Sequence, residues 1–171
     1  MSSSIGLLSC RATPVAVTSH IIVEANDATQ FVKVDETLSA LKRKKGDDAV
    51  IRVVTKDAQG NVVPNVPFIL KREGSTNRQN VQLSNRTITV INAAGTSARV
   101  DTPSISLYAV TGADGTATFT VKQDDSIGLV TNVYAQAYQS SLESNKLPVM
   151  FTVITSPDTP LASYWGHMAE T

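Results

Sequence analysis

Residues 46–68 read GDDAVIRVVTKDAQGNVVPNVPF, and this stretch decides the fold. Residues 49–56 are rich in β-branched side chains, which fit the pleated surface of a strand. Residues 57–61, Asp-Ala-Gln-Gly-Asn, are turn formers. Residues 66–71 then place alternate apolar side chains on one face, with the two-residue period of a strand. The stretch predicts two β-strands with a turn between them.

The rest of the chain repeats this alternation of short β-rich runs and turn residues. The Asp114-Gly115 pair between two such runs is a strong hairpin signal, because both residues tolerate positive φ. Strand-helix-strand alternation is missing, which argues against a parallel α/β sheet. The sequence therefore predicts an all-β sandwich or barrel. The further expected strands are residues 15–24, 81–83, 87–91, 97–100, 105–110, 116–121, 133–138 and 149–154.

Alternation within these runs also predicts which side chains fill the core. The residues expected to be buried are Ala117, Phe119, Val121, Val133, Ala135, Phe151 and Val153.

One segment departs from the strand pattern. Residues 35–46 begin with Asp35 and Glu36, end in a basic run and finish at Gly46. An acidic start, a basic end and a terminal glycine are helix signals that match the helix dipole. A short helix of one to three turns is expected here.

Composition restricts the class of protein. The 171 residues suit one domain, and 42% hydrophobic with 18% charged residues is typical of a folded chain. Fifteen Lys and Arg balance 15 Asp and Glu, so no overall field favours nucleic acid. Cys10 is the single cysteine, which rules out an intrachain disulfide. No apolar run reaches the roughly 20 residues of a membrane helix, so direct membrane insertion is not expected.

Residues 46–68, together with 111–117 and 133–135, resemble the bacterial Ig-like group 1 domains of intimins, invasins and related inverse autotransporters. The shared pattern is a strand, an Asp-x-x-Gly-Asn turn, Val-Pro and a second strand, followed later by Thr-Gly-x-Asp-Gly-Thr. The resemblance covers about residues 46–154 and implies an immunoglobulin-like β-sandwich of antiparallel strands. Residues 73–110 are longer than in a minimal repeat, and the sequence after Gly128 lacks the compact strand start of the family.

The resemblance also divides the chain. Residues 1–14 are expected to be an N-terminal extension, 15–155 the bacterial Ig-like domain, and 156–171 a linker or the start of the next module. Two prolines mark the boundary after the last strand. Residues 165–168, Trp-Gly-His-Met, are similar to the segment that comes after the Ig-like repeats of RatA-like enterobacterial adhesins.

Catalytic and metal chemistry find little support. His20 and His167 lie far apart in sequence, with no nearby motif for a zinc or catalytic site, so we expect no enzyme, no metal and no cofactor. The carboxylate pairs at 47–48 and 124–125 are read as solvated turns, with an ion site at a module junction as the alternative. The basic residues 42–45 are read as a solvated helix end rather than an anion-binding patch.

Four aromatic residues are candidate contact residues: Tyr134, Tyr138, Tyr164 and Trp165. Rigid amphipathic rings are favoured at interfaces. Tyr134 and Tyr138 share one strand face, opposite Val133 and Ala135, and packing is the alternative fate of either ring.

For function, the resemblance implies a non-catalytic extracellular module that spaces or presents the host-binding region of a bacterial surface adhesin. Its partners would be neighbouring Ig-like modules, and its parent protein would be anchored in the bacterial outer membrane. Two alternatives stay open. The chain could itself bind a host protein or glycan, through residues 73–110, or it could be an accessory sandwich of a secreted hydrolase.

Overall fold

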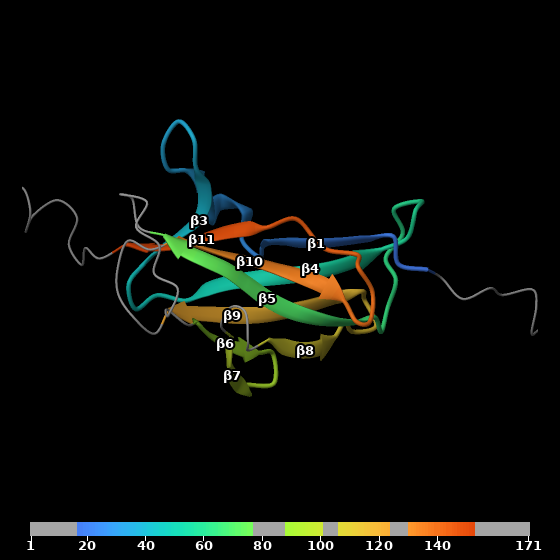
Figure 1. The fold of residues 1–171 in the computed structure, drawn as a ribbon. Helices are drawn as coiled ribbons and strands as arrows, with labels where there is room; N and C mark the ends of the chain where they lie inside the picture. The colour runs from blue at the N-terminus through green and yellow to red at the C-terminus, as the bar shows by residue number, and fades with distance from the viewer. Residues whose placement is uncertain (1–16, 77–87, 101–105, 124–129, 153–171) are drawn as a thin grey trace, which may run out of the picture.

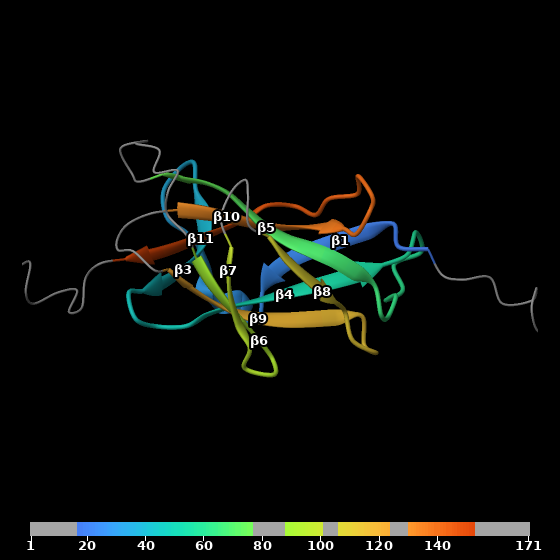
Figure 2. The same ribbon diagram turned by 60° about the horizontal axis from the view of Figure 1, so that its bottom comes forward.

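The computed structural model describes residues 17–76, 88–100, 106–123 and 130–152, and these form two β-sheets packed face to face (Figure 1). Turning the molecule by 60° shows the two layers from another side (Figure 2). The five-stranded sheet has the order β1 (His20–Ala25), β4 (Ala49–Lys56), β9 (Thr116–Gln123), β6 (Ile88–Asn92) and β7 (Ser97–Val100). The six-stranded sheet has the order β2 (Phe31–Lys33), β3 (Ser39–Lys44), β11 (Leu147–Thr152), β10 (Val130–Ala137), β5 (Pro67–Thr76) and β8 (Leu107–Val110).

Antiparallel pairing dominates both sheets. The exception among the described pairs is β3 with β11, which run parallel. The 3-10 helix η1 (Ala28–Gln30) leads from β1 to β2, where the chain passes from one sheet to the other. The prediction of an all-β sandwich of mainly antiparallel strands is confirmed.

The core lies between the two sheets and follows the predicted alternation. Phe119 packs edge-on against Phe68 across the sandwich, with ring centroids 6.1 Å apart. The other predicted core residues Val121, Val133, Ala135 and Phe151 are buried, whereas Ala117 is only partly buried against the cluster. Val153 lies outside the described residues.

The predicted helix at residues 35–46 is wrong, because Ser39–Lys44 forms strand β3. This strand supplies the backbone ladder for β11 on one side and for β2 on the other. Leu41 enters the main core, and Ala40 packs with Val130 and Met150 in a second cluster. Non-local pairing and burial thus override the helix-like charge pattern. Gly46, with φ +95°, belongs to the turn after β3 instead of capping a helix.

Several expected strands agree with the structure at their centres and differ at their ends. The first begins at His20 rather than at residue 15, and β5 extends to Thr76. Strand β2 was not predicted. The expected strand at residues 81–83 lies outside the described residues.

The two ends of the described chain lie at opposite ends of the sandwich (Figure 1). At one end, Ser19 donates its N–H to the carbonyl of Lys56 at 2.8 Å, beside the turns that follow β4 and precede β9. We call this end the N-terminal pole. At the other end, Lys45 donates its N–H to the carbonyl of Thr152 at 2.7 Å. We call that end the C-terminal pole.

Candidate interaction surfaces

The turn after β4 holds the N-terminal pole through one carboxylate. An oxygen of Asp57 accepts the backbone N–H groups of Gln59 and Asn61, both at 2.9 Å. Gly60 closes the turn at φ +88°. These bonds, chiefly that from Asn61, lower the pKa of Asp57, so the carboxylate is charged at neutral pH.

The turn before β9 is built in a related way. Asp114 accepts the backbone N–H of Thr116 at 3.0 Å and its hydroxyl at 2.9 Å, and the hydroxyl bond leads in lowering the pKa of Asp114. Gly115 adopts φ +74°, as the Asp-Gly signal predicts. The tight turn is thus present, but the predicted hairpin is wrong, because β9 pairs with β4 and β6 in one sheet while β8 lies in the other.

Two buried threonines tie these turns together. The Thr55 hydroxyl donates to the carbonyl of Val63 at 2.6 Å and lies 3.2 Å from the Thr111 hydroxyl oxygen. The Thr111 hydroxyl oxygen also accepts the N–H of Val66 at 2.9 Å. Both side chains are inaccessible to solvent and fully engaged, which is the condition under which buried hydroxyls stabilise a fold. Buried side-chain hydrogen bonds therefore hold the turns of the N-terminal pole together.

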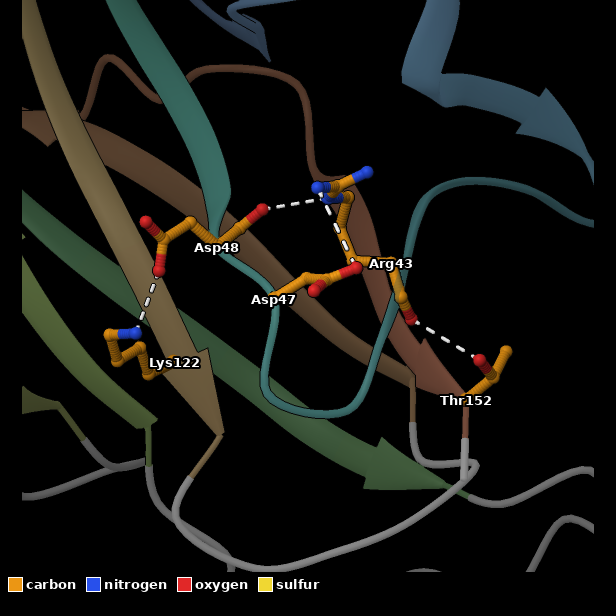
Figure 3. Close-up of polar contacts among 5 residues, drawn as sticks. All are labelled: Arg43, Asp47, Asp48, Lys122 and Thr152. Atoms are coloured by element: carbon orange, nitrogen blue, oxygen red, sulfur yellow. Dashed lines mark hydrogen bonds and ion pairs between the residues drawn. The ribbon is translucent and has the colours of Figure 1, made fainter. Parts of the chain in front are cut away.

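Ion pairs and hydrogen bonds hold the C-terminal pole (Figure 3). Arg43 donates through Nε to the carbonyl of Asp48 at 2.7 Å and lies 3.8 Å from the Asp47 carboxylate. Lys122 on β9 pairs with the Asp48 carboxylate at 2.7 Å. The Thr152 hydroxyl donates to the Arg43 carbonyl at 3.4 Å. Side chains from both sheets thus meet where the described chain ends.

Asp47 and Asp48 turn toward different cations and do not converge on one point (Figure 3). Within the described ranges, no three His, Cys, Asp or Glu side chains gather closely enough to hold a metal ion. His20 is exposed at the start of β1. Residues 124–125 and His167 lie outside the described residues.

Tyr134 and Tyr138 project from the outer side of the six-stranded sheet, but they have different surroundings. The ammonium of Lys146 lies 5.3 Å from the centre of the Tyr134 ring and pairs with Glu73 at 2.9 Å. Burial, followed by Glu143 and Glu73, raises the pKa of Tyr134. Tyr134 is therefore partly covered by a surface ion cluster. Tyr164 and Trp165 lie outside the described residues.

Tyr138 forms an exposed aromatic pair that the sequence analysis did not identify. Its ring meets that of Tyr108 edge-on at 5.0 Å, and the two residues are 43% and 55% exposed. Val110, two residues along β8, is 45% exposed. The alternation of residues 105–110 contains the signal, but only the position of β8 beside β5 brings Tyr108 to Tyr138.

A groove of about 520 Å³ runs beside β8. One wall is Tyr108, Ala109 and Val110, and the facing side is formed by β9. The lining also includes the β6–β7 turn and one charged residue, Asp114. We call the groove and the exposed side chains of β8 the β8 flank.

Comparison with known proteins identifies the family. The model of the family Bacterial Immunoglobulin-like 21 matches residues 46–154, well over half of the chain. The chain belongs to this family. No curated protein sequence matches it.

Among solved structures, this Bacterial Immunoglobulin-like 21 domain is similar to the Yersinia pseudotuberculosis adhesin InvE. The sequence identity is 26% and the TM-score 0.58, over 84% of this chain and 34% of the InvE chain. This chain thus spans about a third of that structure. A lipoprotein from Bacteroides thetaiotaomicron is 13% identical with a TM-score of 0.44, over 88% of this chain and 93% of the other, a likeness too low to carry an argument. The family match and InvE together identify an Ig-like domain of the intimin/invasin type.

The family match begins at residue 46, yet the sandwich begins earlier. Strands β1, β2 and β3 precede the matched region; β1 pairs with β4 and β3 with β11 inside it, and β2 pairs with β3. The matched motif itself contains the residues that build the N-terminal pole, Thr55 to Val66 and Thr111 to Thr116. No helix in the described part of this Bacterial Immunoglobulin-like 21 domain has the length and hydrophobicity to cross a bilayer.

Proposed function

We propose that this chain is a non-catalytic extracellular module of a bacterial surface adhesin that spaces or presents the region binding host surfaces. The observation that carries the proposal is the position of the two ends of the described chain at opposite poles of the sandwich (Figure 1). A module whose chain enters at one pole and leaves at the other adds its whole length to a stack. Its partners would be the neighbouring Ig-like modules of the same polypeptide.

The construction of the poles supports this role. A spacer transmits orientation only if the ends that meet its neighbours are rigid. Buried hydroxyls and a carboxylate-organised turn fix the N-terminal pole, and Arg43 and Lys122 connect strands of both sheets at the C-terminal pole. The proposal places the domain at residues 15–155, with an extension before it and a linker or the next module after it.

The location follows from the likeness to an adhesin. We place the module outside the cell, in a parent protein anchored in the outer membrane. Antibody binding to residues 17–152 on intact cells tests this placement, with a cytoplasmic protein as the control. Labelling that requires permeabilised cells would contradict it.

A replacement experiment in the parent adhesin separates spacing from direct binding. One variant lacks residues 17–152, and the other carries an unrelated Ig-like domain of similar length in their place. Spacing predicts that deletion lowers attachment to host cells and replacement restores it. If replacement fails to restore attachment while the protein still reaches the surface, this module itself binds the host.

The non-catalytic role has its own test. The purified chain should hydrolyse neither peptide, ester nor glycoside substrates above the level of buffer. Activity that survives purification and disappears with a single carboxylate or histidine substitution would contradict the proposal.

A further inference from the structure

The six-stranded sheet ends at the β8 flank, and the pairing between β6 and β9 in the five-stranded sheet stops beside it. In the six-stranded sheet, β8 is the last described strand and pairs with β5 on one side. In the five-stranded sheet, β6 pairs with β9 only up to Asn92, which lies opposite Phe119. The first residues of β9 therefore have β4 on one side and no described strand on the other.

The direction of the backbone groups on β8 follows from its register with β5. Thr111 donates its N–H to the carbonyl of Val66, and Ala109 and Leu107 follow with the same phase along the ladder. The N–H and C=O groups of Tyr108 and Val110 must then point away from β5. Among the described residues, no backbone partner meets these four groups.

Strand β9 also has a residue beside the groove whose outward-facing backbone groups meet no described strand. The N–H of Thr55 donates to the Gly115 carbonyl, so alternate residues from Gly115 onward face β4. Thr116 and Thr118 face the other way, and the Asp114 turn engages both backbone groups of Thr116. The backbone groups of Thr118 lie beyond the last residue of β6 and meet no described strand. A free strand edge thus borders the groove at β8, whereas on β9 only Thr118 has outward-facing backbone groups that neither β6 nor the Asp114 turn engages.

We propose that the β8 flank binds an extended peptide of another protein, which adds to β8 as a further strand of the six-stranded sheet. Four main-chain hydrogen bonds, to the N–H and C=O groups of Tyr108 and Val110, hold the peptide. Its alternate side chains enter the groove over Ala117 and Phe119, and the others cover Tyr108 and Val110. This binding role goes beyond spacing and does not depend on it.

The lining of the groove specifies the peptide. Apolar residues such as Val110 and Ala117 line it beside polar Thr118, so a peptide that alternates valine or an aromatic residue with threonine is favoured. Asp114 is the one charged residue among those lining the groove, and its carboxylate favours one lysine or arginine at that end of the peptide.

The geometry favours a peptide over two other occupants. A second copy pairing through β8 would bury little more than a four-residue strand, whereas a stable dimer needs about 800 Å² from each partner. A sugar could stack on Tyr108 and bond to single backbone groups, but its hydroxyls do not repeat at the spacing of the N–H and C=O groups along a strand edge.

Nuclear magnetic resonance of the full 171-residue chain tests the proposal. The probe is the synthetic peptide Lys-Val-Thr-Val-Tyr-Val-Thr, blocked at both ends. Binding should shift the amide signals of Tyr108, Val110 and Thr118 and slow the hydrogen exchange of the Tyr108 and Val110 amides. Signals from the C-terminal pole, such as that of Lys122, should stay unchanged.

Val110→Pro is the decisive variant, because proline removes an N–H that the fold does not use and is tolerated on an edge strand. It should weaken binding at least about tenfold, since one hydrogen bond is lost and its acceptor is left unsatisfied. Val110→Thr keeps the N–H and should bind within about threefold of the original, a change under 1 kcal/mol. If Val110→Pro does not fold, Ala93→Trp on the exposed β6–β7 turn narrows the groove instead and should also weaken binding.

Charge complementarity has a separate control. Asp114→Asn keeps a side-chain oxygen for the hydrogen bonds with Thr116. It should weaken binding of the lysine peptide but not binding of a peptide in which norleucine replaces the lysine. Equal binding by Val110→Pro and Val110→Thr would overturn the proposal, as would unshifted Tyr108 and Val110 signals at millimolar peptide. Shifts at the β8 flank on raising protein concentration alone would assign the flank to a second copy. Shifts there with maltopentaose but not with the peptide would assign it to a sugar.

Discussion

Gly115→Ala examines the packing of the N-terminal pole. A Cβ atom at Gly115 would lie 2.8 Å from the Cβ of Val62, and 3.3 Å and 3.4 Å from the carbonyl oxygens of Val63 and Thr55. The left-handed backbone costs about 1–2 kcal/mol for any residue with a Cβ. The overlap adds about 1–3 kcal/mol, because backbone and a branched Cβ cannot swing aside as a flexible chain end would. The expected loss is roughly 2–5 kcal/mol, the sum of the two.

Gly95→Ala is the matched control. Gly95 has φ +90°, but a Cβ there would meet nothing within 4 Å, so it incurs the backbone strain alone. Urea denaturation of both variants at pH 7 measures the free energy of unfolding. The difference between the two losses of unfolding free energy measures the steric overlap alone. Gly115→Ala should be less stable than Gly95→Ala by about 1–3 kcal/mol.

A second substitution locates the overlap. Val62 is half exposed, so Val62→Gly should cost little by itself and remove the Cβ that meets residue 115. The double variant should be more stable than the sum of the single losses predicts, by about 1 kcal/mol. Equal losses for Gly115→Ala and Gly95→Ala would refute the packing argument. An unchanged midpoint for Gly115→Ala would refute the turn itself.

Three further substitutions test the core, the turn carboxylate and the C-terminal pole. Phe119→Ala should lower the free energy of unfolding by about 3–5 kcal/mol and Thr118→Ala, on the opposite face, by under about 0.5 kcal/mol; comparable losses in urea denaturation would contradict the register. Folding lowers the pKa of Asp57, so its ionised form stabilises the fold above about pH 4 and this contribution is lost as the pH falls through the folded-state pKa. The melting-temperature advantage over Asp57→Asn should therefore shrink from pH 6 to pH 3, and a constant difference would count against the carboxylate. Lys122→Ala removes the half-exposed pair with Asp48 and should cost about 0.2–1 kcal/mol, with the difference from the original chain reduced in about 0.5 M salt; a loss insensitive to salt would mean that Lys122 acts through packing.

Features set by neighbouring residues were predictable from the sequence. The positive φ of Gly115 follows from the local chemistry of an Asp-Gly turn. The burial of Phe119 and Val133 follows from the two-residue period, since a strand with one apolar face must bury that face. Each of these predictions needed only a few adjacent residues.

Features set by distant partners were not predictable in this way. Residues 39–44 carry helix signals, but they form a strand because they pair with β11, which lies more than 100 residues later in the sequence. The same limit applies to Arg72 on β5. Alternation with Phe68 and Leu70 places it on the inner face, but the burial of a charged side chain there depends on residues from other strands. Sequence separation, rather than weakness of the local signal, accounts for these failures.

The candidate contact residues follow the same division. Tyr134 and Tyr138 share a face, as alternation predicted, yet their neighbours give them different environments. Lys146 and Glu73 partly cover Tyr134, while Tyr108 from β8 meets Tyr138 and leaves both rings exposed. The exposure of an aromatic ring depends on which strand lies beside it. The order of strands in a sheet cannot be predicted from the sequence of one strand alone.

The surfaces that the two proposals use share the Asp114 turn but differ elsewhere, and this makes the proposals separable. Spacing depends on the poles, whereas the peptide is proposed to bind along β8, at the side edge of the six-stranded sheet. One module can space and bind at once where its neighbour at the N-terminal pole leaves Tyr108 and Val110 open. Val110→Pro should therefore abolish peptide binding while the length of a multi-module fragment, measured by small-angle scattering, stays the same. A shortened or bent fragment would show that β8 takes part in a module junction, and the separation of the two roles would be wrong.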